Sequence, residues 1–553
     1  MPSLLRTRTG CWLAAAGAVG LTAAVGQDAP TTAPAEPTTT AAAPATTTAP
    51  TTAPTTAPAT APAPLPPPGM LKCTETVLGD AAERFGQTIL SPDRRHVAYA
   101  ARRGERFVVV HDGTAGKTYD GIGRGSIRFS PDGRRLAYAA RIGAQWRYVI
   151  DGEETDLVDG VAGLTFSDDG KHVAYIAGGG RRRAVFVDGK PGKQYTGIGE
   201  LTLSPDARHV ACMARKQRRR IVVLDGREGP MYREVGGLTF SPDGRRLAYR
   251  ARKDDRQLIV DVSVDAPDDH REGVPGDVTE PPVFGPRGKR LAYAVKRGEA
   301  WTVVVDGKPG PPFDAVMQGT PVFGPAGKRL AYAGRKGERW VMVADWRAGD
   351  AYDRMGGPVF GPDGRLAYRA QADRMQCVVI DGKPSRLHRF AGSPIFSPAL
   401  PGRQAGGGHL AFVASIEKKL YLELDGKEGP TYDAVVGPSF SPDGRRVAFA
   451  ARQADRCFVA ICDVAGWPNA VVAGRPYPRM GHPVFSPDGR RVAYPVRRDK
   501  RVLVVAGGQE SPEYDRIFQR SRLAFDTPTT LHFLALRSNQ YLRVELEVDL
   551  DAP

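Results

Sequence analysis

Cysteine is scarce in this chain of 553 residues, and its scarcity excludes a fold held together by disulfide bonds. Six cysteines occur, and Cys11 lies in an apolar stretch near the N-terminus. The other five are an odd number without regular spacing: Cys73, Cys212, Cys377, Cys457 and Cys462. Disulfide scaffolds carry even sets of cysteines at characteristic spacings. We therefore expect a fold that depends on its hydrophobic core, with most cysteines acting as small buried apolar residues.

Long apolar runs are also nearly absent from the sequence. The run at residues 11–25 is too short to cross a bilayer. Because Arg6 and Arg8 precede this run and small residues follow it, we expect residues 1–26 to be a secretory signal peptide, with an uncleaved anchor as the alternative. Residues 27–68 are almost entirely Thr, Ala and Pro, which is typical of a disordered linker. The expected location is extracytoplasmic (periplasmic, cell-envelope or secreted), with no transmembrane span after signal cleavage.

Motifs that carry catalysis, metals or cofactors are missing as well. The chain has no Gly-x-Ser-x-Gly elbow, no His-x-x-x-His and no Cys-x-x-Cys. His96, His172 and His209 share one position after a recurrent turn, where other copies carry Arg or Leu, so we interpret them as repeat variation. For the acidic insertion at residues 261–277 we favour a solvated loop over a calcium site. We expect no catalytic residue, no metal and no cofactor.

One repeated phrase, by contrast, is abundant. It reads Phe-Ser-Pro-Asp-Gly-Arg-Arg-Leu-Ala-Tyr at residues 129–138, and residues 240–249, 440–449 and 485–494 are nearly identical. The Ser-Pro-Asp position recurs every 36 to 45 residues, at Ser91, Ser130, Ser167, Ser204, Ser241, Gly285, Gly324, Gly361, Ser397, Ser441, Ser486 and Asp526. A fixed period of this length is typical of a solenoid unit or a propeller blade.

The pattern inside each unit predicts four short antiparallel strands. Ser-Pro-Asp-Gly is a tight turn, because proline fixes φ and glycine tolerates a positive φ. A second strand follows, as at residues 446–450, and a third strand ends in Asp-Gly, as at residues 107–113 and 302–308. A short strand with Tyr or Phe often comes next. Because the apolar runs are nearly continuous, as in sheets buried on both faces, we predict an all-β protein, a β-propeller of twelve four-stranded blades.

The Phe-Ser-Pro-Asp-Gly-x-x-Leu-Ala-Tyr unit resembles the WD40-like (PD40) repeat of the TolB-type β-propeller family. The resemblance covers residues 80–548, nearly the whole chain after the linker. Three copies depart from it, because Gly285, Gly324 and Gly361 stand in place of the serine. The resemblance implies a propeller fold but no particular function, because the family includes non-catalytic interaction modules and propellers attached to peptidases or lyases.

Twelve blades can close in more than one way. We expect two tandem six-bladed rings, at residues 69–316 and 317–553, because propellers usually have four to eight blades; seven plus five blades and one large ring are the alternatives. The last unit lacks a fourth strand, and a spare segment at residues 74–85 precedes the first unit. In the two-ring arrangement this segment completes blade 6, and residues 312–316 complete blade 12. In one ring, residues 74–85 pair directly with residues 541–548.

Positive charge gathers at the predicted loops between second and third strands. The formal net charge is +16. Blade geometry places these loops on one face of the ring, whereas the Ser-Pro-Asp-Gly and Asp-Gly turns, whose acids offset bases, lie on the other. A positive face favours an anionic partner, and solvated tips in an Arg-rich composition are the alternative interpretation. The candidate binding residues are Arg102, Arg103, Arg182, Arg183, Arg218, Arg219, Arg220, Lys253, Arg297, Lys336, Arg497 and Arg498.

These observations predict an exported, non-catalytic propeller scaffold that binds a protein or an acidic polymer through its loop face. Nucleic acid is the least favoured partner, because aromatic residues do not interleave with the tip charges. Trp146, Trp301 and Trp340 follow the tips at strand positions, where we expect them to pack. One alternative function is a polysaccharide- or peptide-processing enzyme that uses the propeller channel. Another is a purely structural partner in an envelope complex.

Overall fold

A computed structural model describes residues 69–81, 84–180, 182–399, 408–518 and 523–549. The expected signal peptide and linker, residues 1–26 and 27–68, lie outside the described residues. None of the described residues belongs to a helix with the length and apolarity needed to cross a bilayer.

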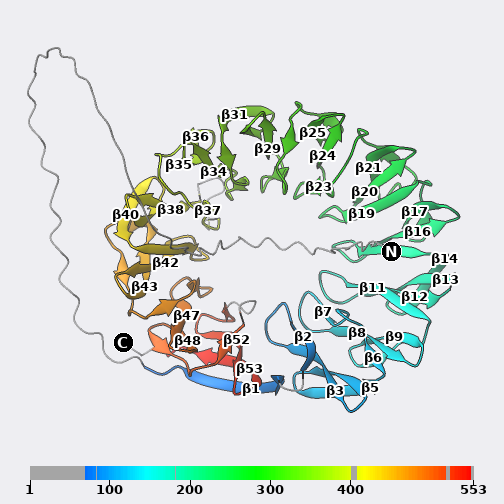
Figure 1. Ribbon diagram of the computed structural model, residues 1–553, viewed down its shortest axis with the longest axis horizontal. Coiled ribbons are helices and arrows are strands. Elements are labelled where there is room, and N and C mark those ends of the chain that lie inside the picture. Colours follow the sequence, from blue (N-terminus) through cyan, green and yellow to red (C-terminus); the bar gives the residue numbers. More distant parts are fainter. Residues whose placement is uncertain (1–68, 82–83, 181, 400–407, 519–522, 550–553) are drawn as a thin grey trace, which may run out of the picture. The chain divides into compact units, whose positions relative to one another are not determined.

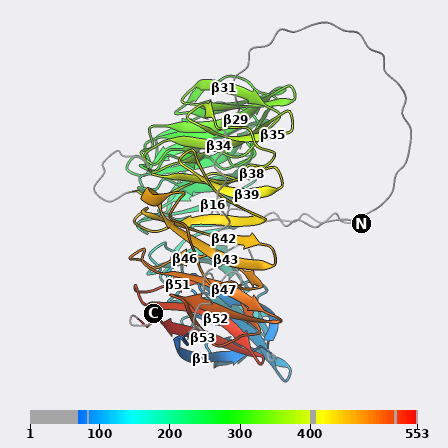
Figure 2. The same cartoon turned by 90° about the vertical axis from the view of Figure 1, so that its left-hand side faces the viewer.

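Twelve antiparallel sheets follow one another around a single ring (Figure 1). In eleven of them the strands run in sequence order from the innermost to the outermost, and in the last sheet the first strand of the chain, β1 (Lys72–Asp80), is the outermost. The predicted all-β propeller with twelve four-stranded blades is therefore confirmed. Figure 2 shows the ring from its side. In five blades two short segments share the place of the first strand.

Blade 1 contains β2 (Arg84–Leu90), β3 (Val97–Arg103), β4 (Arg106–His111) and β5 (Thr114–Tyr119). Blade 2 contains β6 (Gly121–Ile122), β7 (Arg128–Phe129), β8 (Leu136–Ile142), β9 (Gln145–Ile150) and β10 (Glu153–Glu154). Blade 3 contains β11 (Gly160–Phe166), β12 (Val173–Gly179), β13 (Arg182–Val187) and β14 (Lys190–Tyr195). Blade 4 contains β15 (Ile198–Leu203), β16 (Val210–Lys216), β17 (Arg219–Leu224) and β18 (Arg227–Glu228).

Blade 5 contains β19 (Glu234–Phe240), β20 (Arg246–Lys253), β21 (Arg256–Ser263) and β22 (His270–Glu272). Blade 6 contains β23 (Val283–Phe284), β24 (Leu291–Arg297), β25 (Ala300–Val305) and β26 (Lys308–Pro309). Blade 7 contains β27 (Ala315–Val316), β28 (Val322–Phe323), β29 (Leu330–Lys336), β30 (Arg339–Ala344) and β31 (Arg347–Tyr352). Blade 8 contains β32 (Arg354–Met355), β33 (Val359–Phe360), β34 (Leu366–Ala372), β35 (Met375–Ile380) and β36 (Lys383–Pro384).

Blade 9 contains β37 (Ile395–Phe396), β38 (Leu410–Ile416), β39 (Lys419–Leu424) and β40 (Lys427–Tyr432). Blade 10 contains β41 (Ala434–Phe440), β42 (Arg446–Gln453), β43 (Arg456–Asp463) and β44 (Val472–Ala473), with the 3-10 helix η2 (Val464–Gly466) after β43. Blade 11 contains β45 (Arg479–Met480), β46 (Val484–Phe485), β47 (Val492–Arg498), β48 (Arg501–Ala506) and β49 (Gln509–Glu510). Blade 12 contains β50 (Arg516–Ile517), β51 (Ala524–Phe525), β52 (Thr530–Arg537), β53 (Gln540–Glu547) and β1 (Lys72–Asp80).

The ring closes where β1 joins β53, with Thr74 opposite Glu545. This is the pairing expected for one large ring, so the expectation of two six-bladed rings is wrong. Residues 312–316 do not complete blade 12 either, because Phe313 bridges Trp301 of blade 6 and β27 pairs with β29 at the start of blade 7. Pairing β1 with β53 covers the edge that the last blade would otherwise expose, and no second closure is needed.

The described part of the chain forms twelve hydrophobic clusters, one at each interface between neighbouring blades, including the interface between blades 12 and 1. The repeated Leu-Ala-Tyr-Ala phrase explains their composition. On the second strand of blade 2, Leu136 and Tyr138 face blade 1 and contact Ala98 and Ala100 there. The intervening Ala137 faces blade 3 instead. Large side chains of one blade thus fill the space left by alanines of the preceding blade, as close packing requires.

A second repeated contact links neighbouring blades near the end of the fourth strand. A tyrosine hydroxyl donates to a glutamate on the outermost strand of the next blade, in Tyr119–Glu154, Tyr195–Glu228, Tyr232–Glu272, Tyr477–Glu510 and Tyr514–Glu75. Each glutamate also pairs with a Lys or Arg, and we call this arrangement the tyrosine–glutamate latch. Because Glu75 belongs to β1, the strand that closes the ring uses the same latch as the internal blades.

Chemical cross-linking tests the closure directly. Lys72 Nζ lies 2.7 Å from a carboxylate oxygen of Glu547, and both side chains are mostly exposed. A carbodiimide should therefore join them by an amide bond within one chain, detected by mass spectrometry of peptides from the monomer band. Glu547→Gln should abolish this link. Its absence in the wild type, or its appearance in dimers alone, would contradict a ring closed by β1.

The latch should contribute measurably to stability. Glu510 is buried, accepts from Tyr477 at 2.8 Å and pairs with Arg498 at 3.0 Å. Glu510→Ala leaves the buried tyrosine hydroxyl without an acceptor, so the free energy of unfolding should fall by about 1–3 kcal/mol. The matched control is Glu513→Ala, which removes the more exposed partner of the same arginine and should cost less than about 0.5 kcal/mol. Equal denaturant midpoints for the two variants would argue against the latch.

Candidate polyanion interface

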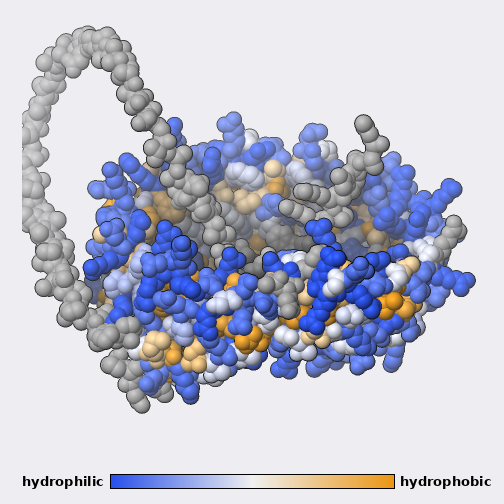
Figure 3. All heavy atoms as spheres, turned by 60° about the horizontal axis from the view of Figure 1, so that its bottom comes forward, coloured by the Kyte–Doolittle hydropathy of each residue, from blue (hydrophilic) through white to orange (hydrophobic). Residues whose placement is uncertain are grey.

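The hairpins between second and third strands all emerge on one face of the ring, which we call the tip face. This follows from the pairing order, because in an antiparallel sheet successive turns lie alternately at the two ends of the strands. The turns between second and third strands therefore all lie at the same end. Of the twelve candidate binding residues, Arg183 is half-buried and the other eleven are exposed. Hydrophilic residues dominate the surface in Figure 3, with hydrophobic residues in smaller patches between them.

The candidates are spread over seven blades, and two of them already have acidic partners. Lys253 pairs with Glu272 at 3.1 Å, and Arg498 pairs with Glu510 and Glu513. Both belong to tyrosine–glutamate latches. The structure does not bring Arg102, Arg103, Arg182, Arg183, Arg297, Lys336 and Arg497 to one point, because they lie at the tips of blades 1, 3, 6, 7 and 11.

Arg218, Arg219 and Arg220 do meet other arginines, in a groove between blades 4 and 5. They come from the β16–β17 hairpin and line two adjoining cavities of ≈ 410 and ≈ 470 Å³. The full set of arginines, which we call the arginine groove, is Arg215, Arg218, Arg219, Arg220, Arg233 and Arg252. Its floor is formed by small and apolar residues of blade 4, including Gly199, Met213 and Ala214.

Few acids balance these six arginines. Arg233 pairs with the exposed Asp255 at 2.6 Å, and Arg252 approaches Glu234 at 3.9 Å. Among the described residues, Arg218 and Arg219 have no ion pair, and the buried Nε of Arg252 has no hydrogen-bond partner. Planar guanidinium groups that line a groove can bind carboxylate, sulfate or phosphate groups through paired N–H donors.

Sequence reasoning missed Arg215, Arg233 and Arg252 as members of this groove. Arg233 directly precedes β19, and Arg252 is on β20 opposite Glu234 of β19. Both arginines therefore come from the neighbouring blade. Arg215 is on β16, directly opposite Arg220 of β17. The clustered charge at residues 215–220 was a visible signal, whereas the contribution of blade 5 depends on how two blades meet.

The opposite face uses its arginines differently. Arg135 pairs with Asp151 at 2.7 Å, donates to the carbonyl of Lys171 in blade 3 and lies over the ring of Phe166. The corresponding arginines Arg246, Arg290 and Arg329 each pair with an aspartate, donate to a backbone carbonyl of the next blade and lie over a phenylalanine ring. Those cations hold neighbouring blades together.

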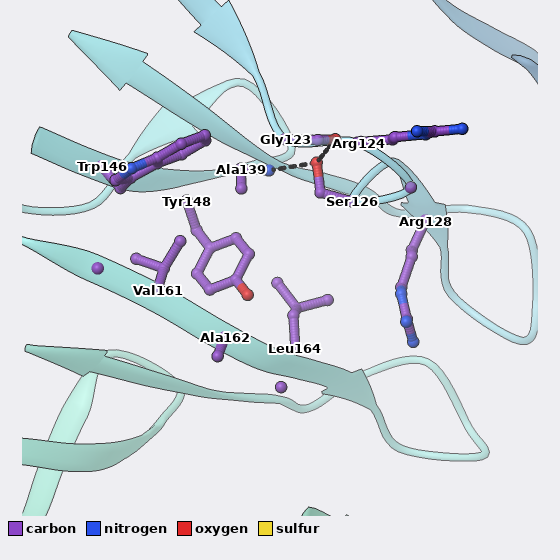
Figure 4. Close-up of a pocket in the computed structure, with 13 residues that line it drawn as sticks. Gly123, Arg124, Ser126, Arg128, Ala139, Trp146, Tyr148, Val161, Ala162 and Leu164 are labelled. Atoms are coloured by element: carbon purple, nitrogen blue, oxygen red, sulfur yellow. Dashed lines mark hydrogen bonds between the residues drawn. The ribbon is translucent and has the colours of Figure 1, made fainter. Parts of the chain in front are cut away.

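Another cavity, of ≈ 330 Å³, lies between blades 2 and 3 (Figure 4). Trp146, Tyr148 and Leu164 line one part of it, and Arg124 and Arg128 lie at the other side. Burial raises the pKa of Tyr148 to about 12, so its hydroxyl stays protonated. Trp146 is half-buried and packs against the core cluster of blades 2 and 3, which agrees with a packing role.

Blades 8 and 9 hold a buried acid beside a buried histidine. His388 takes the place that tyrosine occupies in the latch, and its Nε2 lies 3.6 Å from Glu423 Oε2. Tyr421 lies against His388 Nδ1 at 3.3 Å and donates to Glu428. Burial lowers the pKa of His388 and raises the pKa of Glu423 to about 7. Both side chains are less than 10% exposed, so they are poorly placed to reach a polymeric substrate.

Comparison with known proteins finds solved structures at low similarity only. No known family model and no curated protein matches the chain. Among solved structures, a eukaryotic initiation factor matches with 11% identity and a TM-score of 0.33, covering 58% of this chain and 96% of that one. TolB from Acinetobacter baumannii matches with 18% identity and a TM-score of 0.23, covering 42% and 64%. The β-propeller domain of the Trilobed protease from Pyrococcus furiosus matches with 11% identity and a TM-score of 0.26, covering 55% and 94%.

Glu423 should make stability depend on pH. Its folded-state pKa of about 7 exceeds the ordinary value of 4.5, so its contribution is intact below pH 4.5 and is lost as pH rises through 7. Glu423→Gln should therefore raise the unfolding midpoint relative to wild type at pH 8, by about 2 kcal/mol in free energy, and change it little at pH 4. The exposed Glu417→Gln in the same hairpin is the control. A difference between wild type and Glu423→Gln that is the same at both pH values would contradict the raised pKa.

Proposed function

We propose that the chain is an exported, non-catalytic propeller scaffold that binds an acidic partner through its tip face. The observation that carries the proposal is the arginine groove, where six arginines face two acids. Holding like charges together is unfavourable, so a fixed cluster of arginines supports a role in binding an anion rather than in stability.

The partner class follows from the shape of the charged surface. The groove lies between blades 4 and 5, and the neighbouring tip of blade 3 carries Arg182 and Arg183. These three consecutive blades offer a row of cations, which suits a linear polymer with repeated negative groups. Together with the expected extracytoplasmic location, this favours an acidic polysaccharide. The rigid blades position the arginines before binding, which lowers the entropy cost of association.

A catalytic role in the channel has less support. The histidine–glutamate pair of blades 8 and 9 is buried. A cavity of ≈ 650 Å³ lies beside His388, and none of its lining residues comes from the innermost strands β32, β33 and β37. We therefore propose that this cluster is structural, as a modified form of the latch.

Salt-dependent binding to a sulfated polysaccharide tests the proposal. The wild type should bind heparin, used as a model polyanion, with an affinity that falls steeply as salt rises. Arg218→Ser, Arg219→Ser and Arg220→Ser combined should weaken binding about tenfold or more and flatten the salt slope, because guanidinium–anion contacts are lost.

The matched control removes the same charge from the opposite face. Arg134, Arg245 and Arg445 are exposed residues of the Ser-Pro-Asp-Gly turns. Their combined change to Ser should leave the affinity within about twofold if the groove, rather than net charge, is responsible. Equal losses in the two triple variants, or no binding by the wild type, would overturn the proposed function.

A further inference from the structure

A recurring ion pair on the face opposite the tips is altered in blade 1. The residue after the Ser-Pro-Asp turn pairs with the Asp that follows the third strand. In several blades the pair is Arg with Asp, as in Arg135–Asp151 and Arg290–Asp306. In blades 1, 3, 4 and 9 the pair is His with Asp, in His96–Asp112, His172–Asp188, His209–Asp225 and His409–Asp425.

Blade 1 alone among these four adds a second histidine. His111 precedes Asp112, whereas Val187, Leu224 and Leu424 occupy the matching places in blades 3, 4 and 9. Val187, Leu224 and Leu424 belong to hydrophobic clusters that are shared with the next blade. His111 instead places Nε2 in a buried position without a hydrogen-bond partner among the described residues. An unpartnered buried nitrogen at an apolar position requires an explanation beyond packing.

The nitrogens of two imidazole rings lie near one carboxylate oxygen of Asp112. Asp112 Oδ1 accepts the N–H of Val97 at 2.9 Å, which fixes the carboxylate. Its Oδ2 lies 2.5 Å from His96 Nδ1 and 3.8 Å from His111 Nε2. Within the described residues, this is the one group of three whose possible ligand atoms all lie within 4.8 Å of one another.

The surroundings suit a partly shielded cation. The ring of Phe129 from blade 2 lies 5.6 Å from the ring of His111 and 6.3 Å from that of His96, and forms an apolar wall. The three side chains are 23–39% exposed, so the cluster lies close to solvent although His111 Nε2 itself is buried. Asp93 adds negative charge near His96, and Arg543 adds positive charge.

We propose that His96, His111 and Asp112 bind Zn²⁺. Two imidazole nitrogens and one carboxylate oxygen are donors that Zn²⁺ accepts, and in tetrahedral geometry ligand atoms at zinc bond lengths lie about 3.4 Å apart. The distances of 2.5 and 3.8 Å lie on either side of that value. The ion takes the place of the proton shared by His96 and Asp112, and water completes its coordination. Sequence reasoning missed this site because His96 precedes the hairpin of β3 and β4 whereas His111 ends it. This separation along the chain matches no recognised zinc motif.

Calorimetric titration of the tag-free full chain with Zn²⁺ after chelator treatment tests the proposal. We expect saturable binding of one Zn²⁺ per chain. His111→Val, which installs the residue of blade 3, should weaken the affinity by more than about 100-fold, because even indirect partners of metal ligands contribute 10–100-fold. His96→Arg should do the same and should fold, since Arg is the residue that blades 2 and 6 use. The control is His209→Arg in blade 4, which should not change Zn²⁺ affinity.

A transplant tests whether the three residues are sufficient. Blade 4 has His209, Asp225 and the Phe240 equivalent of Phe129, and lacks the second histidine. Leu224→His should therefore raise the stoichiometry from one to two Zn²⁺ per chain. A folded variant that binds one ion would overturn this donor set. Unchanged affinity in His111→Val, or no saturable binding by the wild type, would overturn the site itself.

Discussion

Packing of large side chains in one blade against alanines in the preceding blade is the contact on which the rest of this structure depends. It recurs at most interfaces around the ring. Where blade 12 meets blade 1 and where blade 3 meets blade 4, Leu534 and Ile176 of the preceding blade stand in place of the alanine. Because both faces of every sheet are buried in this way, the hairpins are the variable and solvent-exposed parts. The propeller can therefore vary its charge at the tips without disturbing its core.

Much of the fold could be predicted from the sequence, because each unit carries its own turns and strands. Ser130 illustrates this, since it is fully buried and its Oγ accepts the N–H of Arg135, as a turn-forming serine should. The number of rings could not be predicted. One ring and two rings would both provide the last blade with a fourth strand. The sequence of residues 74–85 is compatible with pairing to blade 6 and with pairing to residues 541–548. The choice depends on contacts between segments more than 400 residues apart.

The candidate site was predicted in part for the same reason. Arg218, Arg219 and Arg220 are adjacent in the chain, and their charge is visible without a structure. Arg233 and Arg252 join them because blade 5 packs beside blade 4, which no local pattern records. The sequence also could not distinguish free cations from engaged ones. Lys253 and Arg218 look alike as tip residues, yet Lys253 neutralises a latch glutamate and Arg218 faces the groove.

The pairing of β1 with β53 has a consequence for how this protein can evolve. The first and last strands of the ring, β1 and β53, are neighbours in one sheet. The ring could therefore keep the same contacts between blades if the chain entered it at a different blade. A gene reopened at another inter-blade connection, with the old ends joined by a short linker, would encode the same set of interfaces. A duplicated blade would pack against neighbours similar to those of the original blade. Duplication or deletion of single units could therefore produce rings with more or fewer blades.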